Sequence, residues 1–177
     1  MAIYKTYIQQ TSFDGTSYTK GAVVDLLATY NIICQEMPFI VNPLAKDLPK
    51  RDWPDEDGQD VYVPATRRMK EYTMDVDFLY VGTDTNIRTD LKNFINFLYG
   101  RNTGAVGSLL AIYNAYTDIG RKDVIVQEVS NEVFIAGDSD PDAIAKIKVK
   151  FLVCDPITEV SFSSSTTNGT TTLTLTF

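Results

Sequence analysis

The sequence predicts a mainly β (α+β) fold with one packed α-helix, and three observations support this prediction. Residues 146–156, KIKVKFLVCDP, alternate between charged and apolar side chains, as a strand does when one face lies in a core. Residues 67–82, RRMKEYTMDVDFLYVG, alternate in the same way from Glu71 onward. Ten Tyr and nine Phe residues also favour β structure, because aromatic side chains fit a pleated, half-buried surface.

The two alternating segments carry opposite charges on their polar faces, in a chain whose formal net charge is −7. Opposite charges on neighbouring antiparallel strands contribute roughly 0.2–1 kcal/mol per pair. We therefore expect residues 71–80 and 146–154 to lie side by side in one sheet; the alternative is that both faces are simply solvated. The basic face holds Lys146, Lys148 and Lys150, and the acidic face holds Glu71, Asp75 and Asp77.

Residues 83–100, TDTNIRTDLKNFINFLYG, form the one clear helix of the sequence, because their apolar residues recur at helical spacing. Thr83 or Asp84 is suited to cap its start, and Gly100 stands where a C-terminal glycine is expected. The apolar stripe predicts packing against the core rather than a cofactor site. It consists of Ile87, Leu91, Phe94, Ile95 and Leu98.

The remaining regular elements are predicted from shorter patterns. Residues 2–10 alternate weakly and are expected to form an edge strand, whereas residues 21–30 cluster their apolar side chains as a short helix does. Further strands are expected at 30–37, 108–116 and 122–137, with a turn at 137–143 before the lysine-bearing strand.

A long loop interrupts this pattern. Residues 38–66 contain five of the seven prolines of the chain, so this stretch forms neither a helix nor a central strand. A loop of this length inside a compact domain is usually functional or mobile. Its acidic part, DWPDEDGQD (52–60), invites comparison with calcium loops, but aligning Gly58 with their fixed glycine puts Trp53 and Pro64 at the two end ligand positions. No metal site is therefore expected.

The C-terminal segment, residues 157–177, differs in composition because Ser and Thr dominate it. Asn168-Gly169 is a strong signal for a two-residue hairpin turn, since both turn positions need a positive φ. We expect a projecting hairpin; a disordered linker followed by one last strand is the alternative. The predicted organisation is a β domain over residues 1–156 and a C-terminal hairpin or arm over residues 157–177.

Composition excludes several classes of function. The chain has no histidine, which removes His-dependent nucleophile systems and the usual zinc sites. It has no phosphate-binding glycine loop, and its acidity disfavours non-specific binding of nucleic acid. Cys34 and Cys154 are interpreted as buried thiols. The N-terminus does not resemble a signal peptide, and no apolar run reaches the length of a membrane span. We expect no catalytic residue, cofactor or metal.

Taken in order, these segments resemble the distal tail protein of long-tailed bacteriophages. In that family a loop with an Asp-Gly pair, here Asp57-Gly58, precedes a long strand, and the last core strand tends to end in Asp-Pro, here Asp155-Pro156. The resemblance covers residues 20–156. It rests on the runs PLAKDLPKRDWPDEDGQDVYVP, RRMKEYTMDVDFLYVG, IRTDLKNFINFLYG, SLLAIYN and IAKIKVKFLVCDP.

The resemblance implies a tail-tube-like fold: a two-sheet β-sandwich or barrel with one packed α-helix, the long Pro-rich loop and a C-terminal β-hairpin. It implies a structural virion protein, assembled in the cytoplasm of the bacterial host, that forms a hexameric ring around the DNA channel. The ring would join the tail tube to the tail tip or baseplate. Its partners would be copies of itself and other tail proteins, with DNA as passive cargo and no membrane.

A closed ring of identical subunits needs two different complementary faces on each subunit. We expect loop 43–64 and hairpin 157–177 to supply them, with Trp53 as an apolar anchor; alternatively, Trp53 covers its own core. The candidate interface residues are Trp53, Asp57, Gly58, Val61, Tyr62, Phe162, Asn168, Gly169, Leu173, Leu175 and Phe177.

Other functions are compatible with the same residues. A major tail tube subunit, or another ring subunit of the tail hub, is the alternative with the same fold. A carbohydrate-binding β-sandwich is the alternative from another class, because the many tyrosines and the single tryptophan could stack on sugars. An enzyme is the weakest interpretation, since no residue pattern points to catalysis.

Overall fold

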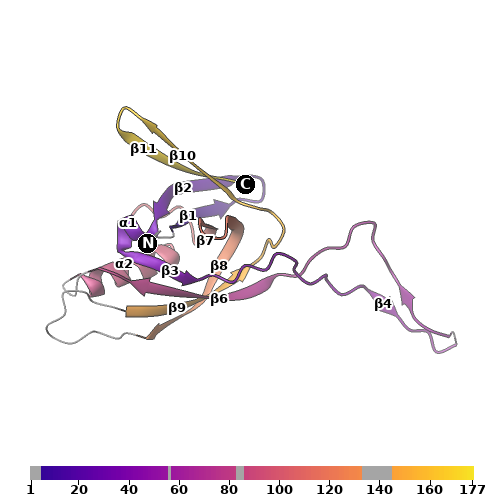
Figure 1. The fold of residues 1–177 in the computed structure, drawn as a ribbon. Helices are drawn as coiled ribbons and strands as arrows, with labels where there is room; N and C mark the ends of the chain where they lie inside the picture. Colours follow the sequence, from indigo (N-terminus) through magenta and orange to yellow (C-terminus); the bar gives the residue numbers. More distant parts are fainter. Residues whose placement is uncertain (1–4, 56, 83–85, 133–144) are drawn as a thin grey trace.

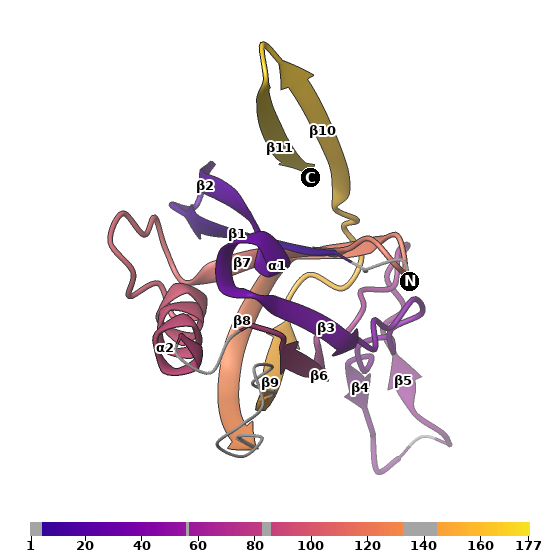
Figure 2. The same ribbon diagram turned by 60° about the vertical axis from the view of Figure 1, so that its left-hand side comes forward.

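The computed structural model describes residues 5–55, 57–82, 86–132 and 145–177. In these ranges the chain forms a large sheet with two helices, a long arm that extends away from the sheet, and a separate hairpin (Figures 1 and 2). The elements are β1 (Thr6–Phe13), β2 (Tyr18–Asp25), α1 (Leu26–Tyr30), β3 (Ile32–Glu36), β4 (Lys50–Arg51), β5 (Asp60–Val61), β6 (Tyr72–Tyr80), α2 (Ile87–Leu98), β7 (Leu109–Asn114), β8 (Ile119–Glu132), β9 (Ala145–Val153), β10 (Ser161–Thr167) and β11 (Thr170–Thr176).

Seven strands form one antiparallel sheet in the order β2-β1-β7-β8-β9-β6-β3, and β10-β11 and β4-β5 form two small sheets. The predicted mainly β fold with a packed helix, a long loop and a C-terminal hairpin is confirmed. The strands are divided between one large and two small sheets rather than between two comparable ones. The prediction of an edge strand near the N-terminus is wrong, because β1 pairs with β2 on one side and with β7 on the other.

The lysine-bearing strand β9 lies between two strands that carry acidic residues. β6 and β9 pair in a register that sets Asp75 opposite Lys150 and Asp77 opposite Lys148. The closest ion pair joins Lys146 Nζ to Asp77 Oδ2 at 2.7 Å. On its other side β9 pairs with β8, where Glu128 stands opposite Lys150. The predicted side-by-side placement of the two charged segments is confirmed.

One face of the sheet carries the main apolar core, and α2 packs on this core. Phe94 of α2 meets Phe78 of β6 edge to face, with ring centroids 5.4 Å apart. Gly100 follows the helix with a φ of 65°, and its N–H donates to the carbonyl oxygen of Phe97 at 3.0 Å. This is the glycine-terminated helix end that the sequence predicts. At the other end Asn86 is the N-cap residue; the predicted caps Thr83 and Asp84 lie outside the described residues.

The segment 21–30 divides between a strand and a helix. Its first half belongs to β2, where Val23 and Val24 pair with β1, as β-branched residues favour. α1 then begins after Asp25, whose carboxylate accepts the N–H groups of Leu27 and Ala28. The expected short helix is therefore confirmed only for its second half. Neither helix in the described ranges has the length and hydropathy that crossing a bilayer requires.

The two cysteines occupy different environments. Cys34 of β3 is half-buried beside the core, and this burial raises the pKa of its thiol to about 12. Cys154 is exposed, so the prediction of a buried thiol is wrong at this position. The reason is the alternation of β9: Val153 points into the core, and the next residue points away from it.

Candidate assembly surface

Residues 38–70 form an extended ribbon, which we call the arm, and Figure 1 shows it reaching well beyond the sheet. Backbone hydrogen bonds join its outgoing and returning segments at several positions along its length. Near the sheet, the N–H of Lys46 donates to the carbonyl oxygen of Arg68 at 2.7 Å; farther out, the N–H of Tyr62 donates to Pro49 at 3.1 Å. Beyond that point β4 pairs with β5. The predicted Pro-rich loop is thus a paired ribbon that projects from the domain.

The arm concentrates exposed apolar side chains. Within the described ranges, seven of the twelve large apolar residues with substantial exposure belong to it, although it spans less than a fifth of the sequence. Such a concentration on one projecting element is typical of a surface that another chain covers. The seven are Ile40, Val41, Leu44, Trp53, Val61, Tyr62 and Val63.

Five predicted interface residues belong to the outer part of the arm. Trp53 belongs to neither apolar cluster of the core, and the guanidinium of Arg51 lies 3.5 Å from the centroid of its ring. This placement favours the anchor interpretation of Trp53 over a cover for its own core. Asp57 is exposed, and Gly58 has a φ of 93° in the turn at the tip. Val61 of β5 and Tyr62 are exposed on the ribbon itself.

The hairpin β10-β11 has a packed base and a free tip. Asn168 and Gly169 form the turn with φ values of 51° and 77°, as a two-residue hairpin turn requires. All side chains from Ser163 to Thr172 are exposed. In Figure 2 this tip extends away from the sheet. The predicted projecting hairpin is confirmed for the tip.

The apolar residues of the hairpin base contact their own chain. The Phe162 ring stacks on Tyr7, with centroids 4.1 Å apart, and Leu175 is 2% exposed. The Phe177 ring lies 3.5 Å from Lys20 Nζ, and Leu173 packs against the same cluster. Sequence reasoning proposed these four residues for contacts between subunits, but they cover one face of the sheet around β1 and β7. Among the predicted interface residues, those of the arm and of the hairpin tip therefore remain exposed.

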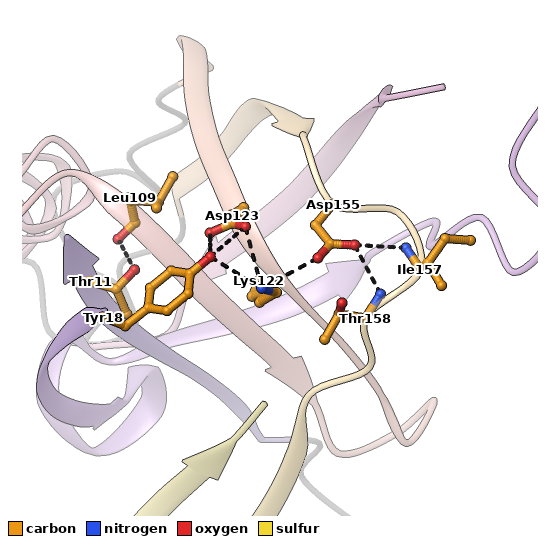
Figure 3. A network of polar contacts seen from close by, with 8 residues as sticks. All are labelled: Thr11, Tyr18, Leu109, Lys122, Asp123, Asp155, Ile157 and Thr158. Atoms are coloured by element: carbon orange, nitrogen blue, oxygen red, sulfur yellow. Dashed lines mark hydrogen bonds and ion pairs between the residues drawn. The ribbon is translucent and has the colours of Figure 1, made fainter. Parts of the chain in front are cut away.

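A polar network fixes the base of the hairpin to the sheet (Figure 3). Lys122 Nζ lies 3.4 Å from Asp155 Oδ2 and 3.1 Å from the hydroxyl oxygen of Tyr18. The Tyr18 hydroxyl donates to Asp123 at 2.8 Å. Asp155 also accepts the N–H of Thr158 at 3.0 Å. These contacts join β2, β8 and the linker between β9 and β10.

The Asp155 carboxyl responds to opposing influences within this network. Burial acts to raise its pKa, but hydrogen bonds from the Thr158 and Ile157 N–H groups and the positive charge of Lys122 lower it below the ordinary value. The ionised carboxylate is thus the form that the fold favours. Asp155 is the acidic residue of the Asp-Pro pair that ends the last core strand in the sequence pattern.

A basic groove lies where the arm joins the domain. It has a volume of about 900 Å³, and one wall comes from the arm base with Lys46, Arg67 and Arg68. The linker 154–158 forms the other wall. We call this site the arm-base groove. Sequence reasoning missed it because Arg67 and Arg68 appear only as the start of a strand pattern, and the linker that completes the groove is far away in sequence.

The described residues contain no cluster of three or more Cys, Asp or Glu side chains placed to hold a metal ion. The described residues of the acidic segment, 52–55 and 57–60, lie along the exposed end of the arm, with a turn at Gly58. The other acidic turn, 138–142, lies outside the described residues.

No family model and no curated protein matches the sequence. Among solved structures, the chain is similar to the Dit protein of phage SPP1, whose structure is described as a paradigm of the hub adsorption apparatus in phages that infect Gram-positive bacteria. The two chains share 18% sequence identity and superpose with a TM-score of 0.48. The match covers 90% of this chain and 54% of the SPP1 protein, so this chain spans about half the length of that protein. A likeness at this level carries no information about function.

Proposed function

We propose that this chain is a structural subunit of a bacteriophage tail. It assembles with copies of itself, expected as a hexamer, into a ring around the DNA channel that joins the tail tube to the tail tip or baseplate. The observation that carries this proposal is the arm, on which side chains such as Leu44 and Tyr62 are 78% and 68% exposed. Burying apolar surface of this kind stabilises association by roughly 25 cal/mol per Å², which favours a partner that covers the arm.

The ring proposal also fits the two different surfaces of the chain. Closed rings form through head-to-tail contacts, in which one face of each copy binds a different face of the next. The arm is one such face, and the domain from which it projects offers the other. The formal net charge of −7 suits a channel that DNA passes without binding, because like charges repel.

The order of the sequence segments, which resembles that of the distal tail protein, supports a place at the end of the tail tube. A major tail tube subunit or another hub ring subunit would use the same surfaces. Binding assays against isolated tail tubes and tail tips separate these alternatives: a distal tail protein binds both, whereas a tube subunit stacks on itself.

The first prediction concerns assembly through the arm. Wild-type protein is expected to form rings at high concentration, visible by electron microscopy and countable by native mass spectrometry. Tyr62→Ser should raise the concentration at half-assembly roughly tenfold or more, because large aromatic side chains at interfaces often contribute about 2 kcal/mol.

The matched control is Tyr116→Ser, since Tyr116 lies outside the arm and is exposed to a similar degree, 64% against 68%. This variant should assemble like the wild type. A wild-type chain that remains monomeric at every accessible concentration would contradict the proposed function. Quenching of Trp53 fluorescence by a glycan, without assembly, would instead favour the carbohydrate-binding alternative.

A further inference from the structure

The arm separates its charges between its two ends. The tip, residues 52–60, contains five acidic residues and no basic one. The base, residues 44–49 and 65–70, contains four basic residues and one acidic residue, Asp47. Lys50 and Arg51 of β4 lie between the two ends. Asp47 is already engaged, because Lys70 Nζ lies 2.8 Å from its Oδ2 atom. The arm therefore has an acidic end and a basic end.

Apart from the Lys70–Asp47 pair, the charged groups at the two ends have no oppositely charged partner among the described residues. In the part of the chain that the structure describes, the tip carboxylates of Asp52, Asp55, Asp57 and Asp60 make no hydrogen bond or ion pair. At the base, the Arg67 guanidinium donates only to the carbonyl oxygen of Lys46, at 3.1 Å. Neither Arg67 nor Arg68 pairs with a carboxylate of the described residues.

The two ends cannot meet within one copy. Backbone hydrogen bonds join the outgoing and returning segments of the ribbon. At the base the bond is between Lys46 and Arg68, and in the middle it is between Pro49 and Tyr62. β4 and β5 continue this pairing toward the tip. The tip thus stays at the opposite end of the ribbon from the base, as Figure 1 shows. Any tip carboxylate that pairs with Arg67 or Arg68 therefore belongs to another copy of the chain.

The arm-base groove is suited to an acidic segment of a polypeptide. Its volume of about 900 Å³ accommodates several side chains, and guanidinium groups bind carboxylates through two parallel hydrogen bonds. The one carboxylate in its wall, that of Asp155, is held by Lys122 and by backbone N–H groups. It therefore leaves the arginines available to a ligand.

We propose that the acidic arm tip of one copy lies in the arm-base groove of the neighbouring copy. This inference rests on the proposed function, and it specifies which surfaces meet in the ring. Tip and groove are different surfaces of one chain, so the contact is head-to-tail and can continue around a closed ring. Every copy then contributes one tip and one groove, and no tip or groove in the ring is left empty.

Charge reversal tests this contact. The groove variant carries Arg67→Glu and Arg68→Glu, and the tip variant carries Asp55→Lys and Asp57→Lys. Each variant alone places like charges at every contact, so its concentration at half-assembly should rise at least about tenfold. An equimolar mixture should assemble again, because the reversed tip of one variant matches the reversed groove of the other in an alternating ring.

The control variant carries Arg88→Glu and Lys92→Glu, at two exposed positions of α2. These substitutions change the net charge by the same amount as those of the groove variant. It should assemble like the wild type, and circular dichroism of all variants should show an unchanged fold. Normal assembly of the groove or tip variant alone would overturn this inference while leaving the ring intact. A mixture that fails to assemble would overturn it as well. A monomeric wild type would remove the proposed function itself.

Cross-linking gives an independent test, because the exposed Cys154 lies in the groove wall. In a chain with Asp57→Cys, a short bismaleimide should join the tip of one copy to Cys154 of the next, giving a ladder of covalent oligomers on a denaturing gel. Adding Cys154→Ser should abolish the ladder. A chain with Thr166→Cys in place of Asp57→Cys should give none. A ladder that persists without Cys154, or no ladder from assembled rings, would overturn the inference.

Discussion

Lys122 is the residue at which the polar contacts beneath the hairpin converge. Its ammonium lies within reach of the Tyr18 hydroxyl and of the Asp123 and Asp155 carboxylates. Burial acts to lower the pKa of Lys122, but these three oxygen-bearing neighbours raise it above the ordinary value. The charged form is therefore retained. Asp155 in turn holds the linker through the N–H groups of Ile157 and Thr158.

The second prediction follows from the lowered pKa of Asp155. A carboxyl whose pKa is lower in the folded state contributes stability above its unfolded pKa, near 3.8, and loses this contribution as the pH falls through the folded value. Asp155→Asn should lower the free energy of unfolding at pH 7 by about 1 kcal/mol. It should also reduce the further loss between about pH 5 and pH 2.

Urea unfolding at a series of pH values measures both effects. Asparagine keeps one oxygen for the backbone N–H groups, so the comparison isolates the charge that faces Lys122. Asp75→Asn, at an exposed position of β6, serves as the control and should follow the wild-type pH profile. An Asp155→Asn profile parallel to that of the wild type would contradict the assigned role.

At the scale of elements, β9 explains why a chain of net negative charge carries a strand with three lysines on one face. Both neighbours of this strand, β6 and β8, present acidic residues in register with the lysines. The pairs are not equivalent. Asp77 lies within ion-pair distance of both Lys146 and Lys148, whereas Asp75 stands opposite Lys150 and is exposed.

The third prediction compares these two aspartates. Asp77→Ala should lower the free energy of unfolding by about 1 kcal/mol, because it leaves two partly covered ammonium groups without their carboxylate. Asp75→Ala should change it by less than about 0.5 kcal/mol, since exposed ion pairs contribute little. Chemical denaturation of the two variants measures these changes. Equal losses in the free energy of unfolding would contradict the prediction, because they would show that a carboxylate stabilises the sheet by standing opposite a lysine, whether or not the two side chains are in close contact.

At the scale of the whole molecule, the base of the C-terminal hairpin packs against the sheet, whereas the tip of the hairpin projects into solvent. Val160 and Leu175 are buried against Tyr7, Ala111 and Tyr113. An isolated two-stranded hairpin is marginally stable at best, so this packing is what holds β10 and β11 in place. The tip contributes no such contact and is available to a neighbouring chain.

The fourth prediction concerns the boundary after residue 156. A chain that ends there exposes the apolar face around Tyr7 and Tyr113, so it should unfold at a lower temperature and aggregate more readily than the full chain. Deleting the exposed tip residues 166–171 and joining Ser165 to Thr172, which pair in the hairpin, through a new Asn-Gly turn should leave the melting temperature nearly unchanged. Equal stability of the chain ending at residue 156 would instead favour an independent domain over residues 1–156.

Local patterns in the sequence determined the strands β6, β7 and β9, the helix α2 and the turn at Asn168-Gly169. Each of these depends on a period or a turn residue that acts over a few positions. The pairing of β6 with β9 was also predictable, because complementary charges on two alternating segments make that neighbourhood favourable. The prolines determined that residues 38–66 lie outside the main sheet.

Tertiary structure alone decided where the other surfaces lie. β1 became an internal strand, because β2 and β7 both pair with it. Phe162 and Leu175 became packing residues, because an apolar face of the sheet lies beside the hairpin base. The arm-base groove joins Arg67 and Arg68 to a linker almost ninety residues later. These contacts join segments that are distant in sequence, so they depend on how the strands and helices pack together. Local sequence periodicity indicates single strands and helices but not their packing.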